Sequence, residues 1–86
     1  MRKIEICCSS LEEVLEAERA GAYRVELCSA LALGGLTPSY GVIRSVVEAV
    51  KTIKVNVLIR VRGGGFCYNE EEIDAMCRDI EFCREV

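Results

Sequence analysis

The feature that most constrains this chain is the regular alternation of strand-like and helix-like segments along its 86 residues. Apolar runs with strand character are expected at residues 3–8, 23–28 and 54–61, and an amphipathic helical stretch follows each of them. Strands that alternate with helices favour parallel pairing through right-handed crossovers. The near-continuous apolar run at 54–61 fits a strand in a sheet that helices cover. The chain is therefore expected to be an α/β protein with the order βαβαβα.

Short motifs predict where the three helices begin. Ser9 and Ser10 each stand three residues before a glutamate, which is the capping-box spacing. Thr37 followed by Pro38 predicts the start of the second helix, because threonine caps helices and proline suits their first turn. Asn69, which precedes three glutamates, predicts the start of the third. The third helix carries an apolar face that we expect to be buried, formed by Ile73, Met76, Cys77 and Ile80.

Composition argues against several classes of protein. The chain has 11 Lys and Arg against 14 Asp and Glu, a net charge of −3, so no nucleic-acid partner is expected. No apolar stretch approaches the roughly 20 residues of a membrane span, and no secretion signal is evident, so we expect a cytoplasmic protein with reduced thiols and no membrane partner. The absence of histidine excludes histidine metal sites and histidine-based catalysis within this chain.

Polar side chains gather at the carboxyl ends of the predicted strands, where parallel α/β folds place their functional residues. The period of a strand puts these residues in pairs on one face each: Glu5 with Cys7, Glu26 with Cys28, and Arg60 with Arg62. Three polar-faced parallel strands are more typical of the interior of a β/α barrel than of an open sheet.

The charged residues have two open interpretations. Glu5, Glu26 and Arg60 could form an ion network inside a barrel, because charges are too costly to bury unpaired. Alternatively, Glu5 or Glu26 acts as a catalytic acid or base. Arg60 and Arg62 would then hold an anionic ligand beside the glycine run that begins at Gly63.

Two of the six cysteines are candidate metal ligands. Cys7 and Cys28 are expected at the same height on neighbouring strands, which suits Cu(I), a soft ion that prefers thiolates. The same thiols could instead be small buried side chains, or could take a disulfide or redox role. No C-x-x-C motif supports a zinc ribbon or a thioredoxin-like site.

Several motifs of the chain resemble those of the copper homeostasis protein CutC family. They are EIC at 5–7, RVELCSAL at 24–31, LGGLTPS at 33–39 and IRVRGG at 59–64, with Val61 where the family pattern has proline. The resemblance implies a cytoplasmic TIM-type β/α barrel, often dimeric, that is linked to copper tolerance and trafficking. It also implies that Cys7 and Cys28 are the copper ligands in this part of the barrel.

Length limits what the resemblance carries over. A complete barrel takes about 200 residues or more, so residues 1–86 correspond to the N-terminal third of a CutC-like TIM-barrel domain, an incomplete barrel. Three strands alone would leave an open sheet edge and exposed apolar helix faces, so we expect either a fragment of a longer product or a homo-oligomer. The expected function is binding or trafficking of Cu(I) in the cytoplasm. The alternative is a TIM-barrel enzyme of unknown reaction on a small anionic substrate.

Overall fold

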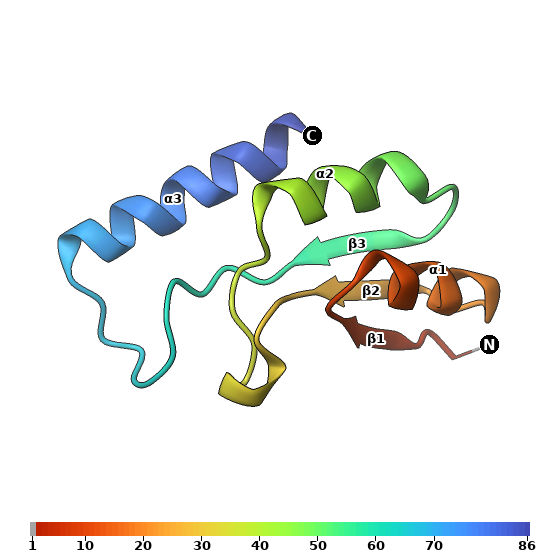
Figure 1. The fold of residues 1–86 in the computed structure, drawn as a ribbon, viewed down its shortest axis with the longest axis horizontal. Coiled ribbons are helices and arrows are strands. Elements are labelled where there is room, and N and C mark those ends of the chain that lie inside the picture. The colour runs from red at the N-terminus through yellow and green to blue at the C-terminus, as the bar shows by residue number, and fades with distance from the viewer. Residues whose placement is uncertain (1) are drawn as a thin grey trace.

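The structure, a computed structural model, describes residues 2–86. Within this range the elements follow the expected alternating order, with one short 3-10 turn added after the second strand (Figure 1). Their bounds are β1 (Glu5–Cys8), α1 (Leu11–Arg19), β2 (Arg24–Leu27), η1 (Leu31–Leu33), α2 (Tyr40–Ala49), β3 (Lys54–Val57) and α3 (Glu70–Glu85). No helix in the described range combines the length and the apolar character needed to cross a membrane.

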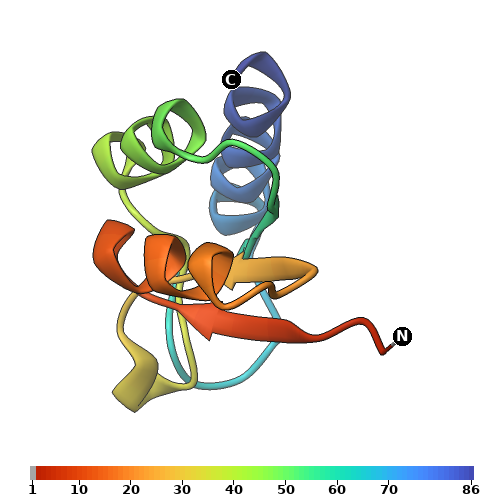
Figure 2. The same cartoon turned by 90° about the vertical axis from the view of Figure 1, so that its right-hand side faces the viewer.

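The strands of residues 2–86 form one parallel sheet in the order β1-β2-β3, which confirms the predicted α/β arrangement. Its register places Cys7 opposite Glu26, and Glu26 opposite Asn56. The helices lie on one side of the sheet, while the loops that follow the strands gather at its carboxyl end (Figures 1 and 2). The opposite face of the sheet is therefore left uncovered by helices.

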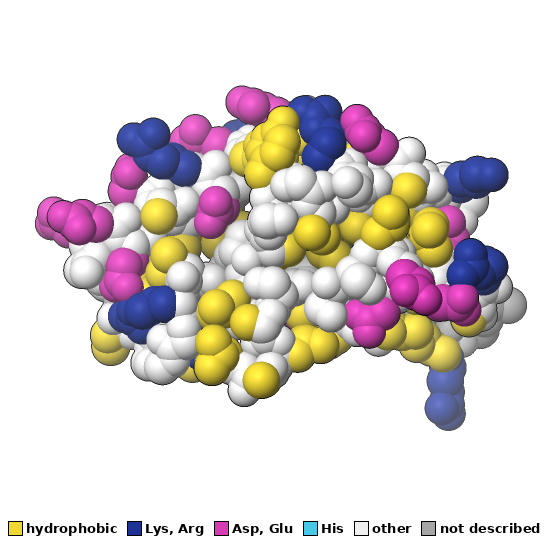
Figure 3. All heavy atoms as spheres, viewed as in Figure 1, with side chains coloured by type: hydrophobic (Ala, Val, Ile, Leu, Met, Phe, Trp, Pro, Cys, Tyr) yellow, Lys and Arg dark blue, Asp and Glu magenta, His cyan; other side chains and the backbone are white. Residues whose placement is uncertain are grey.

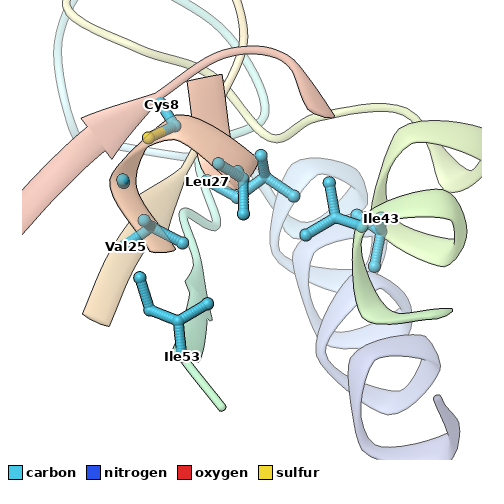
Figure 4. Close-up of a cluster of buried hydrophobic side chains, with 8 residues drawn as sticks. Cys8, Val25, Leu27, Ile43 and Ile53 are labelled. Atoms are coloured by element: carbon cyan, nitrogen blue, oxygen red, sulfur yellow. The ribbon is translucent and has the colours of Figure 1, made fainter. Parts of the chain in front are cut away.

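The core lies between β2 and the helices α1 and α2. Val25 and Leu27 alternate with more exposed residues along β2 and are fully buried, as their strand period predicts. Figure 4 shows Leu27 and Ile43 directed toward each other between β2 and α2. The buried residues of this cluster are Cys8, Val14, Ala17, Val25, Leu27, Ile43, Val46 and Ile53.

The helix starts were predicted correctly in two of three places. The Ser10 side chain caps α1, and Asn69 caps α3 in a reciprocal capping box with Glu72. The prediction of Thr37 as the cap of α2 is wrong, because Ser39 takes that place and its Oγ accepts the N–H of Val42. The Thr37 hydroxyl instead accepts the N–H of Arg60 at 2.7 Å and donates to its carbonyl at 3.2 Å.

The third strand is shorter than predicted. It ends at Val57, because β2 ends at Leu27 and turns away into a loop. The Leu58 N–H still reaches the Leu27 carbonyl, but the backbone of Arg60 bonds to Thr37 instead of to a strand. Residues 58–61 are therefore held by hydrogen bonds to the loop that precedes α2.

The prediction of a buried face on α3 is wrong for this chain. None of the side chains between Glu70 and Glu85 is buried, and Ile73 and Ile80 are 49% and 47% exposed. The helix contacts the core only near its carboxyl end, through Phe82, Cys83 and Val86. Within residues 2–86 the sheet stops at β3, so the rest of α3 has no strand to cover.

An apolar groove runs along the free edge of β3. It lies between α2, β3 and the end of α3, and its apolar lining includes Ile43, Val47, Val55, Val57, Ile59, Ile80 and Val86. On the face of the molecule shown in Figure 3, hydrophobic side chains are exposed at several places. An open strand edge beside such a groove favours association with another strand or chain.

Candidate functional site

The carboxylates of the predicted site have separate partners. Glu5 Oε2 lies 2.5 Å from Arg24 Nε in an exposed ion pair. Glu26 is half-buried, and its Oε1 lies 3.9 Å from the Cys7 sulfur. The structure therefore pairs Glu5 with Arg24, and brings Glu26 next to a candidate metal ligand.

The three cysteines at the ends of β1 and β2 lie in different environments. Cys7 is exposed, whereas Cys8 and Cys28 are each 1% exposed. Both are buried hydrophobic residues, but Cys8 belongs to the packed core cluster and Cys28 lies outside it. Cys28 follows β2 and extends its ladder, since its N–H donates to the Cys8 carbonyl at 2.9 Å. Strand alternation puts the Cys28 side chain on the same side of the sheet as Glu26 and Cys7.

Burial raises the pKa of the Cys28 thiol, and the nearby Cys7 and Glu26 raise it further. The pKa of Cys8 is also raised, first by burial and then by Glu13 and Cys7. Both buried cysteines therefore favour the neutral thiol more than an exposed cysteine does. A metal ion that binds Cys28 must displace its proton.

The loop between Ser29 and Leu36 packs over Cys28. Ser29 and Leu36 close the loop with two backbone hydrogen bonds of 2.8 Å. Gly35 has a φ of +95°, and a Cβ placed on it would lie 3.7 Å from the Cys28 Cβ and 3.9 Å from its sulfur. A Cβ at this position would thus make ordinary contact with Cys28, while the positive φ and a distance of 2.9 Å to Leu58 Cδ2 favour glycine.

Arg60 binds this loop through its guanidinium group. Nη1 donates to the carbonyls of Leu33 at 2.7 Å and Gly35 at 3.2 Å, and Nη2 donates to that of Gly64 at 3.1 Å. The Phe66 ring stacks at 5.0 Å from the guanidinium carbon. Arg60 Nε is buried and has no acceptor among residues 2–86.

Arg62 is committed to its own loop and to α3. Nε and Nη2 form a two-point ion pair with the Glu72 carboxylate, which raises the pKa of Arg62 and lowers that of Glu72. The remaining N–H groups serve backbone carbonyls: Nη1 donates to Gly63 and Gly65, and Nη2 to Cys67. All five guanidinium N–H groups have acceptors, so Arg62 has none left for an anion in this arrangement.

Sequence reasoning missed several residues that shape the site. Glu72 was interpreted only as an acidic residue in the first turn of a helix, and Arg24 and Thr37 were given no role toward their present partners. These contacts join residues 10 to 23 positions apart, so no local spacing signals them. Gly63, a candidate for anion binding, lies against Leu33: a Cβ placed on it would be 3.8 Å from the Leu33 Cβ.

Over the described residues 2–86, no group of three or more Cys, Asp or Glu side chains stands ready to hold a metal ion. Cys7 lies on β1 and Cys28 directly follows the neighbouring strand β2, with the carboxylate of Glu26 beside Cys7. Two thiolates suit a soft ion such as Cu(I), whereas they would be a poor site for a hard cation.

Comparison with known proteins places this segment in a family. The model of the CutC family matches residues 2–86. A CutC family protein of Klebsiella pneumoniae (strain 342) is 54% identical over 86 residues, which are all of this chain and 34% of the relative. One from Parabacteroides distasonis is 49% identical over 85 residues, which are 99% of this chain and 35% of the relative.

A solved structure agrees in fold as well as in sequence. The crystal structure of a CutC protein from Streptococcus agalactiae superimposes with a TM-score of 0.91 at 44% identity, over 99% of this chain and 41% of that chain. This chain spans about a third of the length of the curated relatives it matches. Because sequence and fold both match over nearly every residue, this chain belongs to the CutC family.

Proposed function

We propose that this chain carries a Cu(I) site of a copper homeostasis protein, with Cys7 and Cys28 as thiolate ligands, and that the protein binds or traffics copper in the cytoplasm. The observation that carries the proposal is the position of the two thiols on one side of adjacent strands. Cys7 pairs with Glu26, so Cys28 is its diagonal neighbour. Neighbouring strands lie about 4.8 Å apart and two residues span about 6.6 Å along a parallel strand, so the two Cα atoms are expected about 8 Å apart, from where two thiolates can reach a shared ion.

The surroundings of the two sulfurs support a cation. The Glu26 carboxylate adds negative charge 3.9 Å from the Cys7 sulfur, which attracts a positive ion. Cys7 is exposed and can meet the ion first, while Cys28 is buried and supplies a ligand shielded from water. The two cysteines thus differ in access as well as in pKa. The solved relative from Streptococcus agalactiae is itself named as a putative copper homeostasis protein.

A competition titration tests the proposal. The reduced chain is titrated with Cu(I) against a chelator of known affinity, together with Cys7→Ser, Cys28→Ser and Cys77→Ser. We expect one ion per chain, with affinity reduced at least about tenfold in Cys7→Ser and Cys28→Ser because a two-ligand site cannot spare a thiolate. Cys77, exposed on α3, provides the matched control and should leave the affinity unchanged. Unchanged affinity in Cys28→Ser would refute the proposed site.

A second candidate function is a barrel enzyme on a small anionic substrate, with Glu5 or Glu26 as acid or base. The observation that favours it is the Nε–H of Arg60, a buried donor that has no acceptor within residues 2–86. Titration with inorganic phosphate, followed by the NMR signal of Arg60 Nε, tests this function. A saturable shift would support an anion site, and a signal that does not move would reject it.

A further inference from the structure

We propose that Arg60 is a positioning residue that holds a lid closed over Cys28 and so controls how fast a metal ion reaches that thiol. The lid is defined as residues 29–36. Control of metal access rests on the proposed Cu(I) site. The closing of the lid over Cys28 does not depend on that proposal.

The lid, and not the core, hides Cys28. Cys28 lies outside the core cluster, and the buried Gly35 is next to it, since a Cβ built on Gly35 would lie 3.9 Å from the Cys28 sulfur. The outer part of the lid stands in solvent, since Leu31 and Leu33 are 50% and 57% exposed. Displacing the lid would therefore uncover the thiol without opening the core.

The lid forms its backbone hydrogen bonds within itself, and its carbonyls accept hydrogen bonds from one side chain of the rest of the described chain. Its backbone hydrogen bonds are internal: Ser29 with Leu36 at the base, and Leu33 and Gly35 with Ala30 inside. From the rest of the described chain, the side chain that donates hydrogen bonds to lid carbonyls is that of Arg60. Removal of this guanidinium would leave the base of the lid intact and release the part that covers Cys28.

One donor of the Arg60 side chain is left without a hydrogen bond when the lid is closed, which favours opening of the lid. With the lid closed, Arg60 Nε is buried without an acceptor among residues 2–86, and an unsatisfied buried donor opposes the closed state. Opening would let water reach this N–H. Arg60 also bonds to Gly64 through Nη2, so the same guanidinium links the lid to the glycine loop after β3. The hydrogen bonds that lid carbonyls accept from the rest of the described chain therefore come from one side chain, while Leu33 also packs beside Gly63.

Thiol alkylation provides a test in which three neighbouring cysteines act as reporters. The reduced chain is treated with iodoacetamide, and modification at each cysteine is followed by tandem mass spectrometry. Exposed Cys7 reports the intrinsic reaction, Cys28 reports lid opening, and Cys8 reports opening of the core. Arg60→Gln should raise the rate at Cys28 about tenfold, because two hydrogen bonds to the lid are lost, while the rate at Cys8 stays unchanged.

Two further variants make the result specific. Arg62→Gln is the matched control, since Arg62 bonds to the neighbouring loop and to Glu72 but to no lid carbonyl. Arg60→Lys, which keeps the charge but loses the forked geometry, should give an intermediate rate. The inference fails if Arg60→Gln leaves the Cys28 rate unchanged. It also fails if the rate at Cys8 rises in step, or if Arg62→Gln has an equal effect.

Stopped-flow uptake of Cu(I) tests the metal part separately. Faster uptake in Arg60→Gln than in the unmodified chain would support lid control of the site, and equal rates would overturn it. Alkylation needs no copper, so a chain that binds no copper yet exposes Cys28 in Arg60→Gln would refute the proposed function while the lid stands. A chain that binds copper with unchanged Cys28 alkylation would refute the lid alone.

Discussion

Replacement of Gly35 by alanine should destabilise the fold more than the same change elsewhere, because Gly35 combines two constraints. Its φ of +95° disfavours any side chain, and a new Cβ would lie 2.9 Å from Leu58 Cδ2 and in contact with Cys28. Two other glycines separate these terms. Gly21 has a φ of +87° but open space around it, and Gly41 lies in α2 with neither constraint.

The expected changes in the free energy of unfolding for the three glycine-to-alanine substitutions follow from these environments. Gly21→Ala should cost about 1–2 kcal/mol, the price of a left-handed backbone for a residue with a side chain. Gly35→Ala adds about 1 kcal/mol for overpacking, at the low end because the Leu58 methyl can shift, for a total of about 2–3 kcal/mol. Gly41→Ala should instead stabilise by about 0.5–1 kcal/mol, since alanine is the better helix former.

Urea unfolding of the three variants, followed by circular dichroism, measures these differences in the free energy of unfolding. We expect the free energy of unfolding to be lowest for Gly35→Ala and next lowest for Gly21→Ala. The unmodified chain should follow, and Gly41→Ala should be the most stable. A Gly35→Ala variant as stable as Gly21→Ala would show that the lid has room to move away from Cys28 and Leu58. The tight packing of the lid against Leu58 would then be refuted.

Three further predictions concern pH, association and metal binding. Glu18 accepts the N–H groups of residues 51–53, which lowers its pKa to about 2. Its contribution to stability is present above its ordinary pKa of 4.5 and is lost as the pH falls toward 2. Glu18→Gln should therefore lower the urea midpoint at neutral pH, and the midpoints of variant and unmodified chain should converge near pH 2. We expect a homo-oligomer through the groove beside β3, so Ile80→Glu should shift sedimentation toward monomer, while Ile73→Glu, equally exposed on α3 but outside the groove, should not. Because burial raises the pKa of Cys28, Cu(I) affinity should increase as pH rises toward that pKa, and an affinity independent of pH would contradict Cys28 as a ligand.

Local patterns predicted the elements of the fold because their causes are local. The Ser10 cap bonds to the N–H of Glu13, and the Asn69 cap to that of Glu72, each three residues away. The alternation of Val25 and Leu27 with polar neighbours marked the buried face of β2. Such signals need no knowledge of distant residues.

The site was predicted only in part, because its residues were recognised without their partners. The sequence pointed to Cys7, Cys28, Arg60 and Arg62 at the strand ends. In the structure Cys7 lies on β1 and Cys28 directly follows β2, whereas Arg60 and Arg62 lie in the loop beyond the end of β3 at Val57. The sequence could not show that Arg62 is saturated by Glu72 and loop carbonyls, or that Arg60 fastens the loop over Cys28. The error at Thr37 has the same origin, since its hydroxyl is taken by Arg60.

The order of elements, the parallel α/β class and the family motifs could all be read from the chain, since periodicity and turn chemistry act over a few residues. Tertiary structure decided which cysteine is exposed and which is covered, because burial depends on segments that meet only after folding. It also decided that α3 keeps an exposed apolar face, since the sheet formed by residues 2–86 ends at β3 and offers nothing for that face to cover.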